Sequence, residues 1–301
     1  LKIVASIATG AGHHEIAFTA EDRYAFVTNR AAGTLSIIDI RKLRRVKDLT
    51  TGRTPVAIAY SSLAQAVYVV HQMDGTIVAV DGEKHTIVAR MQARSGLRTL
   101  RFAPDGRLGF ALNGPRNLLY ILDAARNRII QTGNVGMNPD QLAFTENLAY
   151  VRSRDTEIVY MVPLETVGKG GPIPAVDFPG GQIPAGKAAR TSLADAIVPA
   201  PGGPAVLVAN PVDRMIYYYK EGMAAPMGSF RNFGGEPRAV MVVDRSLRER
   251  EPGVYSTEVK LAASGEYSVA FFLDSPRIIH CFDVSVKPSP TGRKGPQVAL
   301  R

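Results

Sequence analysis

Residues 52–81 carry the pattern that decides the fold, and they read GRTPVAIAYSSLAQAVYVVHQMDGTIVAVD. An apolar run over 55–60, an alternating run over 67–71 and a third run that ends at Asp81 are separated by turn residues. Short apolar runs divided by turns in this way are typical of antiparallel β-strands. The stretch therefore predicts three strands in succession, and the run over 86–89 predicts a fourth.

The same unit recurs along the chain. One period separates its first and second starts, Gly10 and Gly52, and Gly136 follows two further periods later. Four short strands in about 42 residues are the size of one β-propeller blade. We therefore predict an all-β fold, a β-propeller of four-stranded blades, because a flat β-sandwich would not repeat at a fixed period. The unit starts are Gly10, Gly52, Leu97 (in a copy without the Gly), Gly136, Leu193 and Gly234.

Both ends of the repeat bear on the blade count and the domain boundaries. Residues 2–7 match the fourth strand of a blade whose first three strands do not lie upstream, so either the C-terminal part supplies those strands or a leading blade has been lost. Six unit starts and this strand together predict seven blades. We assign residues 1–252 to the propeller and 253–287 to a closing blade, with an appended sandwich-like module as the alternative.

Two segments depart from the repeat. Residues 165–190 make their unit longer than the period, and the glycines and prolines of this insertion predict a surface loop. Residues 288–301 form a polar tail, which we expect to be extended or disordered.

Composition excludes several classes of protein. The 301 residues include 36 Lys and Arg against 27 Asp and Glu, a net charge of +9 that favours anionic partners without selecting one kind. With Cys281 as its one cysteine, the chain has no internal disulfide, no Cys-x-x-Cys zinc site and no covalent c-type haem. No apolar run reaches the roughly 18 residues of a membrane span. The chain starts at Leu1 without a signal-peptide pattern, as a processed or truncated product would.

The run YAFVTN over 24–29, followed by GTLSIID over 33–39, resembles the YVTN-type repeat of bacterial and archaeal β-propellers. The resemblance covers residues 1–165 well and residues 190–244 in outline. It implies a periplasmic or extracellular protein. The same superfamily includes the propellers of cytochrome d1 and of the amine dehydrogenase heavy chain, and the blade motif does not separate them. Because one fold hosts many functions, function has to be argued from a site.

Two functions from different classes follow from this resemblance. The main hypothesis is a non-catalytic binding or scaffold protein with a polar mouth to its central channel. The alternative is a redox subunit of an oxidoreductase, either of the haem d1 type or similar to the heavy chain of quinoprotein amine dehydrogenases. In the latter the quinone is on the light chain, so the absence of Trp from this sequence does not exclude it.

Equivalent positions of the repeat predict the channel mouth, because the loop into the innermost strand of every blade lies there. The position after the Pro/His column holds His14, Val56, Arg98, Asp140, Ala194 and Arg238, and the next holds Glu15, Ala57, Thr99, Gln141, Asp195 and Ala239. Opposite charges gathered in a low-dielectric channel shift pKa values, as functional sites do. The candidate ligand-binding residues are His13, His14, Glu15, Arg98, Asp140, Asp195 and Arg238.

The chemistry of this cluster favours a carboxylate ligand. Arg98 and Arg238 would pair with a small or planar carboxylate in bidentate fashion, and Asp140 and Asp195 would orient the two arginines. The alternative is that the same charges only hold the blades together, since structural ion-pair networks also shift pKa values.

Metal and cofactor chemistry rests on few residues. Adjacent histidines on an extended chain point to opposite sides, so only one of His13 and His14 can face the channel axis. His14 is the candidate for a single imidazole ligand to a haem iron or copper, and we otherwise expect no cofactor. Cys281 is expected to be a buried packing residue rather than a ligand with His280. His85, at the start of an outer strand, is expected to be exposed to solvent.

A basic run over 41–47 is the second candidate surface for a partner. It could dock an acidic protein or a phosphate backbone, or it could be a solvated edge that prevents pairing between sheets. The lack of Trp and of interleaved aromatic residues weakens a nucleic-acid surface. The expected partners are therefore an acidic protein or a small anionic ligand.

Overall fold

The computed structural model describes residues 3–181, 195–201, 203–231, 234–237, 239–242, 248–260, 264–273, 277–287 and 297–300. The chain divides into two compact units, Leu1–Val242 and Val243–Arg301. Each unit is described by itself. No helix in the described residues is long and apolar enough to cross a membrane.

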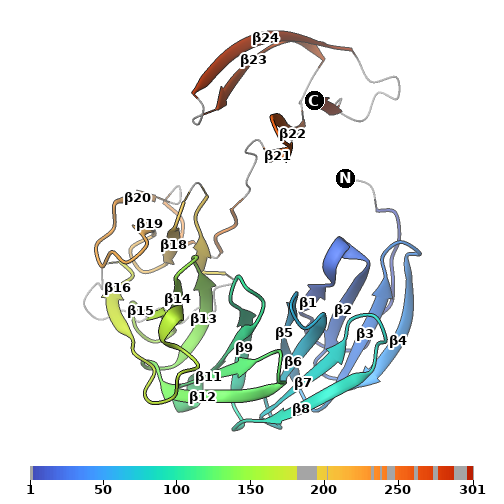
Figure 1. The fold of residues 1–301 in the computed structure, drawn as a ribbon, viewed down its shortest axis with the longest axis vertical. Helices are drawn as coiled ribbons and strands as arrows, with labels where there is room; N and C mark the ends of the chain where they lie inside the picture. Colours follow the sequence, from blue (N-terminus) through green and yellow to red (C-terminus); the bar gives the residue numbers. More distant parts are fainter. Residues whose placement is uncertain are drawn as a thin grey trace. The chain divides into compact units, whose positions relative to one another are not determined.

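The first unit is a succession of four-stranded antiparallel sheets, each with its strands in chain order (Figure 1). Blade 1 consists of β1 (Ile16–Phe18), β2 (Tyr24–Asn29), β3 (Thr34–Asp39) and β4 (Arg44–Thr50). Blade 2 consists of β5 (Pro55–Ser61), β6 (Ala66–His71), β7 (Thr76–Asp81) and β8 (Ile87–Gln92). Blade 3 consists of β9 (Leu97–Phe102), β10 (Leu108–Asn113), β11 (Leu118–Asp123) and β12 (Arg128–Asn134). Short 3-10 helices are Ala20–Asp22, Gly114–Arg116 and Leu164–Thr166.

Two more blades complete the described part of this unit. Blade 4 consists of β13 (Pro139–Phe144), β14 (Leu148–Ser153), β15 (Ile158–Pro163) and β16 (Val176–Pro179). Blade 5 consists of β17 (Ile197–Pro199), β18 (Ala205–Asn210), β19 (Met215–Lys220) and β20 (Gly228–Arg231). The all-β prediction of repeated four-stranded blades is thus confirmed. Five complete blades in the described residues are compatible with the predicted total of seven.

Each pair of consecutive blades shares one hydrophobic core, because the strands alternate and turn one row of side chains toward the next sheet. Phe26 and Ile37 of blade 1 pack against Val67 and Val69 of blade 2, and all four side chains are fully buried. Tyrosines add hydrogen bonds between blades: the hydroxyl of Tyr68 donates to the Ala124 carbonyl at 3.2 Å. Stability of the stack therefore comes from contacts between neighbouring repeats.

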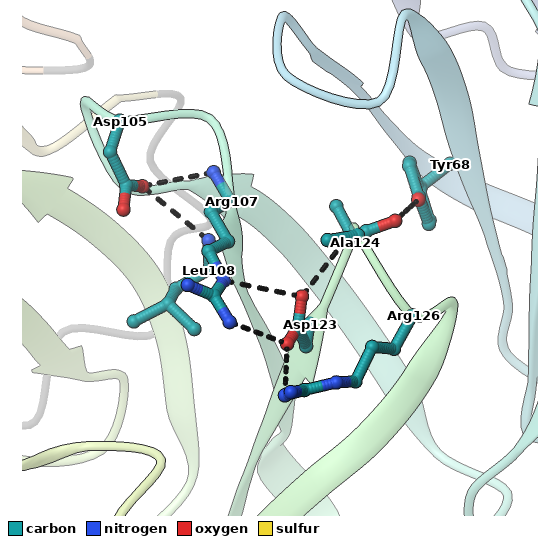
Figure 2. Close-up of polar contacts among 8 residues, drawn as sticks. Tyr68, Asp105, Arg107, Leu108, Asp123, Ala124 and Arg126 are labelled. Carbon is teal, nitrogen blue, oxygen red and sulfur yellow. Dashed lines mark hydrogen bonds and ion pairs between the residues drawn. The ribbon is translucent and has the colours of Figure 1, made fainter.

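The aspartate that ends the third strand of the first three blades organises the turn that follows. The Asp123 carboxylate accepts hydrogen bonds from Arg107 at 3.1 Å, from Arg126 at 3.0 Å and from the Ala125 N–H at 2.9 Å (Figure 2). Asp39 and Asp81 accept backbone N–H bonds of the equivalent turns. The regular spacing of these aspartates is therefore a structural feature of the turn, not a sign of a site.

The last residue of the second strand is also fixed by the turns around it. Asn29, Asn113 and Asn210 occupy this position in three blades, and His71 occupies it in blade 2. The His71 ring lies at 2.9 Å from the Thr51 hydroxyl and at 3.3 Å from the Thr76 carbonyl, with no exposed surface.

Three segments differ from what the sequence predicts. Residues 3–7 form no strand, and Ile3 is 86% exposed, so their pairing in a blade stays a prediction. Part of the insertion is core rather than surface, since Val167 and Ile173 are buried between blades 3 and 4. His85 is buried as well, because its ring packs edge-on against Tyr24 at 4.5 Å.

The second unit contains the remaining strands, β21 (Arg248–Glu251), β22 (Val254–Lys260), β23 (Gly265–Leu273), β24 (Ile278–Val286) and β25 (Gln297–Leu300). Strand β22 pairs with β21 and β25, and β23 pairs with β24 alone in the described residues. Cys281 is exposed on β24, contrary to the expectation of a buried cysteine, because a two-stranded sheet leaves side chains uncovered. Whether this unit closes the propeller or is appended to it stays a prediction. Residues 288–296 of the predicted tail lie outside the described residues.

Candidate functional site

The first strands of all five blades line one cavity of about 1220 Å³. Its wall combines apolar side chains of these strands with charged groups, most of them at the end where the first strands begin. Because every blade contributes its innermost strand, one side chain from each can reach the same space. The charged lining residues are Glu15, Arg98, Arg101, Asp140, Arg154 and Asp195.

Four of the predicted site residues, Glu15, Arg98, Asp140 and Asp195, therefore line one cavity. The two histidines lie beside it rather than in its wall. His14 Nδ1 is 2.7 Å from the Thr28 carbonyl oxygen, and His13 Nε2 is 3.5 Å from a Glu15 carboxylate oxygen in an exposed pair. Arg238 lies outside the described residues.

The same β-bulge recurs near the start of the first strand in three blades. In blades 2, 3 and 4 the register between the first and second strands shifts by one residue, and Val56, Arg98 and Asp140 are the residues left without a partner. Such a bulge bends the strand and re-aims the extra side chain. The sequence repeat thus encodes a position whose side chain leaves the regular pleat at the rim of the cavity.

The strand register of blade 5 corrects one predicted alignment. Ile197 pairs with Val208 as Leu142 pairs with Val151, so Asp195 is equivalent to Asp140. The alignment of the sequence repeats puts Asp195 one position later, in the column of Gln141, because the loop before it breaks the repeat. The bulge column therefore holds His14, Val56, Arg98, Asp140 and Asp195.

Arg101 is a lining residue that the sequence analysis does not single out. It occupies the position of Ala17, Ala59 and Ala143 in other blades, and its guanidinium pairs with Asp195 at 2.6 Å. Both side chains of this pair are about half exposed (52% and 55%), so the pair contributes little to stability. Comparison of these equivalent positions in the sequence would have identified Arg101, because three of the other blades have alanine there.

Arg152 is a second charged residue outside the predicted columns; it does not line the cavity but lies on the strand next to Asp140. Its Nη2 lies 3.6 Å from Asp140 Oδ2, and the two side chains are only 9% and 13% exposed. The equivalent residues of blade 2 are Val70 and Val56, so the fold does not require charge at either position. Comparing the penultimate residue of the second strands would have revealed it: Thr28, Val70, Leu112, Arg152 and Ala209.

Asp140 is the electrostatic centre of this end of the cavity. Burial raises the pKa of its carboxyl group above the ordinary value, and the positive charges of Arg152, Arg154 and Arg98 oppose this rise without cancelling it. The negative charge of Asp155 acts in the same direction as burial. Three positive charges against the two negative charges of Asp140 and Asp155 leave a net positive environment here.

Several buried polar atoms here have no hydrogen-bond partner among the described residues: Asp140 Oδ1, Arg152 Nη1 and Ser153 Oγ. An unpaired buried donor or acceptor costs about 1–3 kcal/mol, more for a charged group. In a native protein a bound water, an ion or a ligand can satisfy such a group. The arrangement is chemically suited to hold an anion that accepts hydrogen bonds from guanidinium groups.

The part of the chain that the structure describes contains no group of three or more His, Cys, Asp and Glu side chains arranged to hold a metal ion. His14 is therefore a candidate for one ligand only, and the rest of a ligand set would have to come from elsewhere.

The chain is similar in structure to chains of known proteins. It matches a chain of Kuenenia stuttgartiensis hydrazine synthase with a TM-score of 0.53 and 11% identity, over 90% of this chain and 65% of that one. It matches a chain of the mitotic checkpoint complex with a TM-score of 0.56 and 14% identity, over 73% of this chain and 65% of that one.

These likenesses show the fold alone, since both identities are low. The chain spans about 65% of the length of each matched chain. No protein-family profile and no curated protein sequence matches it. The matched structures are β-propellers, and with its own four-stranded blades the chain is a β-propeller too.

Proposed function

We propose that this chain is a non-catalytic binding propeller that holds a carboxylate-bearing ligand at the charged end of its cavity. One observation carries the proposal: a buried ion pair, Asp140 with Arg152, stands where blade 2 has two valines. Burying charge is expensive, and a well-packed apolar pair is often as stable or more stable. The charges therefore point to binding rather than to packing.

The residues have distinct roles in this proposal. Arg98 of blade 3 and Arg154 of blade 4 line the cavity and would contact the ligand, because a guanidinium pairs with a carboxylate through two parallel hydrogen bonds. The charge of Asp140 attracts both arginines, and Arg152 pairs with the Asp140 carboxylate. Glu15 and Asp195 also line the cavity, His14 lies beside it, and Arg238 is expected to join from the next repeat.

The setting of this function is part of the proposal. The YVTN-like repeats support membership of that family of propellers and with it a periplasmic or extracellular location. The net charge of +9 supports an anionic ligand or an acidic protein partner. A redox subunit remains the alternative, to be separated by the absorbance of the purified protein.

Isothermal titration with acetate, succinate, citrate and benzoate tests the site. We expect at least one of them to bind the parent, and Arg98→Gln to weaken that binding by about 1.5–3 kcal/mol, the range for hydrogen bonds to charged groups. Arg128→Gln is the matched control, since Arg128 is exposed on β12 of the same blade. No binding of any of the four to the parent, with a lower melting temperature for Arg98→Gln, would leave the charges a purely structural role.

A further inference from the structure

Two kinds of connection lie at the same end of the blades: the turns that follow the second strands and the loops that lead into the first strands. Second and fourth strands run in the same direction in an antiparallel blade, so these segments lie at the same end. Hydrogen bonds join them, for example from the Gln72 N–H to the Thr54 carbonyl at 3.0 Å. We call this surface the loop face; it comprises residues 30–33, 51–54, 72–75, 93–96, 114–117, 135–138, 154–157 and 211–214.

The loop face has an unusual composition for a cationic surface. All its positive side chains are arginines, and its eight segments contain no lysine. Met73 and Met137 are 59% and 61% exposed on it. Protein interfaces are enriched in Arg and Met and depleted in Lys, whereas an ordinary solvated surface carries both cations. The arginines are Arg30, Arg53, Arg94, Arg116, Arg154 and Arg214.

Contacts to neighbouring segments hold several of these guanidinium groups in place. Arg30 donates to the Gln72 side chain at 3.1 Å, and Arg53 donates to Asp74 at 2.7 Å. Arg116 donates to the Ser95 carbonyl at 3.4 Å, and Arg214 donates to the Gly234 carbonyl at 3.2 Å. A guanidinium has five N–H donors, so one tether leaves others to bind a partner. Tethered side chains lose less entropy on binding.

We propose that the loop face docks an acidic segment of a partner protein. Exposed methionines favour a protein over a nucleic acid, and the eight segments contain no aromatic residue on which a base could stack. Asp74, Asp155, Glu157 and Asp213 also interrupt the arginines, which suits spaced carboxylates better than a continuous phosphate backbone. Residues 243–301 of this chain hold nine Lys and Arg against seven Asp and Glu, so this part of the chain offers the loop face no net negative charge.

The inference rests on the proposed binding role but uses arginines other than those that line the cavity, apart from Arg154. The probe is a fluorescein-labelled peptide of glutamate and serine, titrated with the full chain at low ionic strength and followed by fluorescence anisotropy. The test variant combines Arg30→Gln, Arg94→Gln and Arg116→Gln. The control combines Arg44→Gln, Lys84→Gln and Arg128→Gln, which removes the same charge from exposed positions at the opposite ends of the strands.

We expect the loop-face variant to bind the peptide about tenfold more weakly, since three exposed charge pairs are lost, while the control stays near the parent. Equal losses in both variants, no loss in either, or no binding to the parent would overturn the proposal. So would tighter binding of a single-stranded oligonucleotide of the same length through the same arginines. Arg98→Gln should retain peptide binding, which separates a failure of the loop face from a failure of the cavity site.

Discussion

Arg152 and Asp140 show how a repeat can change its chemistry without changing its fold. At the same two positions blade 2 has Val70 and Val56, and the strand register is the same in both blades. Taking a charged pair out of water costs several kcal/mol per ion, and attraction at a distance of 3.6 Å recovers only part of that cost. Blade 4 bears this desolvation cost and blade 2 does not, which agrees with the binding role proposed for the charged pair of blade 4.

His71 makes the pH dependence of stability testable at a single residue. Burial lowers the pKa of its imidazole below the ordinary value, so the folded state prefers the neutral ring. The stability that the neutral His71 ring contributes to the folded state is fully present above the unfolded pKa of about 6.5. It is lost as the pH falls, at no more than about 1.4 kcal/mol per pH unit.

His71→Asn should remove this loss, because Asn fills the same position in three other blades. Urea unfolding at pH 7.5 and pH 5.5 measures the effect, and the variant should lose less stability on acidification than the parent. His85, whose pKa burial also lowers, is present in both proteins and cancels in the comparison. Equal acid sensitivity of the two proteins would contradict this assignment.

At the scale of a single turn, Asp123 stabilises the connection between β11 and β12. Burial alone would raise the pKa of its carboxyl group, but hydrogen bonds from Arg107 and the Ala125 N–H, together with the charge of Arg126, lower it below the ordinary value. A lowered carboxyl pKa contributes stability that is present above the unfolded pKa of about 3.9 and is lost as the pH falls through the folded pKa.

Asp123→Asn should therefore lower the free energy of unfolding by about 1.5–3 kcal/mol at pH 7, the range for hydrogen bonds to a charged group. At pH 3, below the unfolded pKa, the parent has lost part of the stability that its ionised carboxylate contributes, so the difference from the parent should shrink. Denaturant titration at both pH values measures this. Asp105→Asn, at an exposed position on the same blade, is the control with a smaller effect, and a difference that does not change with pH would refute the ionic explanation.

The periodic elements were the predictable part of this molecule. Turn residues and alternating runs recur at a fixed period, so the four-stranded blades could be predicted from them. The register of Asp195 could not be predicted, because the preceding loop breaks the period. An error of one residue in the alignment assigns Asp195 to the position of Gln141 instead of that of Asp140. Arg101 and Arg152 lie in strands outside the two columns used to predict the mouth, and only the structure showed that they reach Asp195 and Asp140.

For the whole molecule, the proposal predicts a colourless protein. A haem-bearing or copper-bearing propeller absorbs above 350 nm, whereas a binding propeller has only the absorbance of its aromatic residues in the ultraviolet. The full chain, purified from its natural compartment, should show no band above 350 nm and no stoichiometric iron or copper by elemental analysis. A visible band that follows the protein through purification would favour the redox alternative.

The double substitution Asp140→Val with Arg152→Val tests the central claim most directly, because it gives blade 4 the residues of blade 2. Each single substitution should lower stability by about 3–5 kcal/mol by leaving one buried charge unpaired, whereas the double variant should unfold near or above the parent. It should also bind the best carboxylate of the panel at least about tenfold more weakly, since Arg98 and Arg154 lose the negative charge that attracts them to this position. Retained stability with lost binding is the predicted result. A double variant that binds like the parent, or that is as unstable as the single variants, would contradict the account.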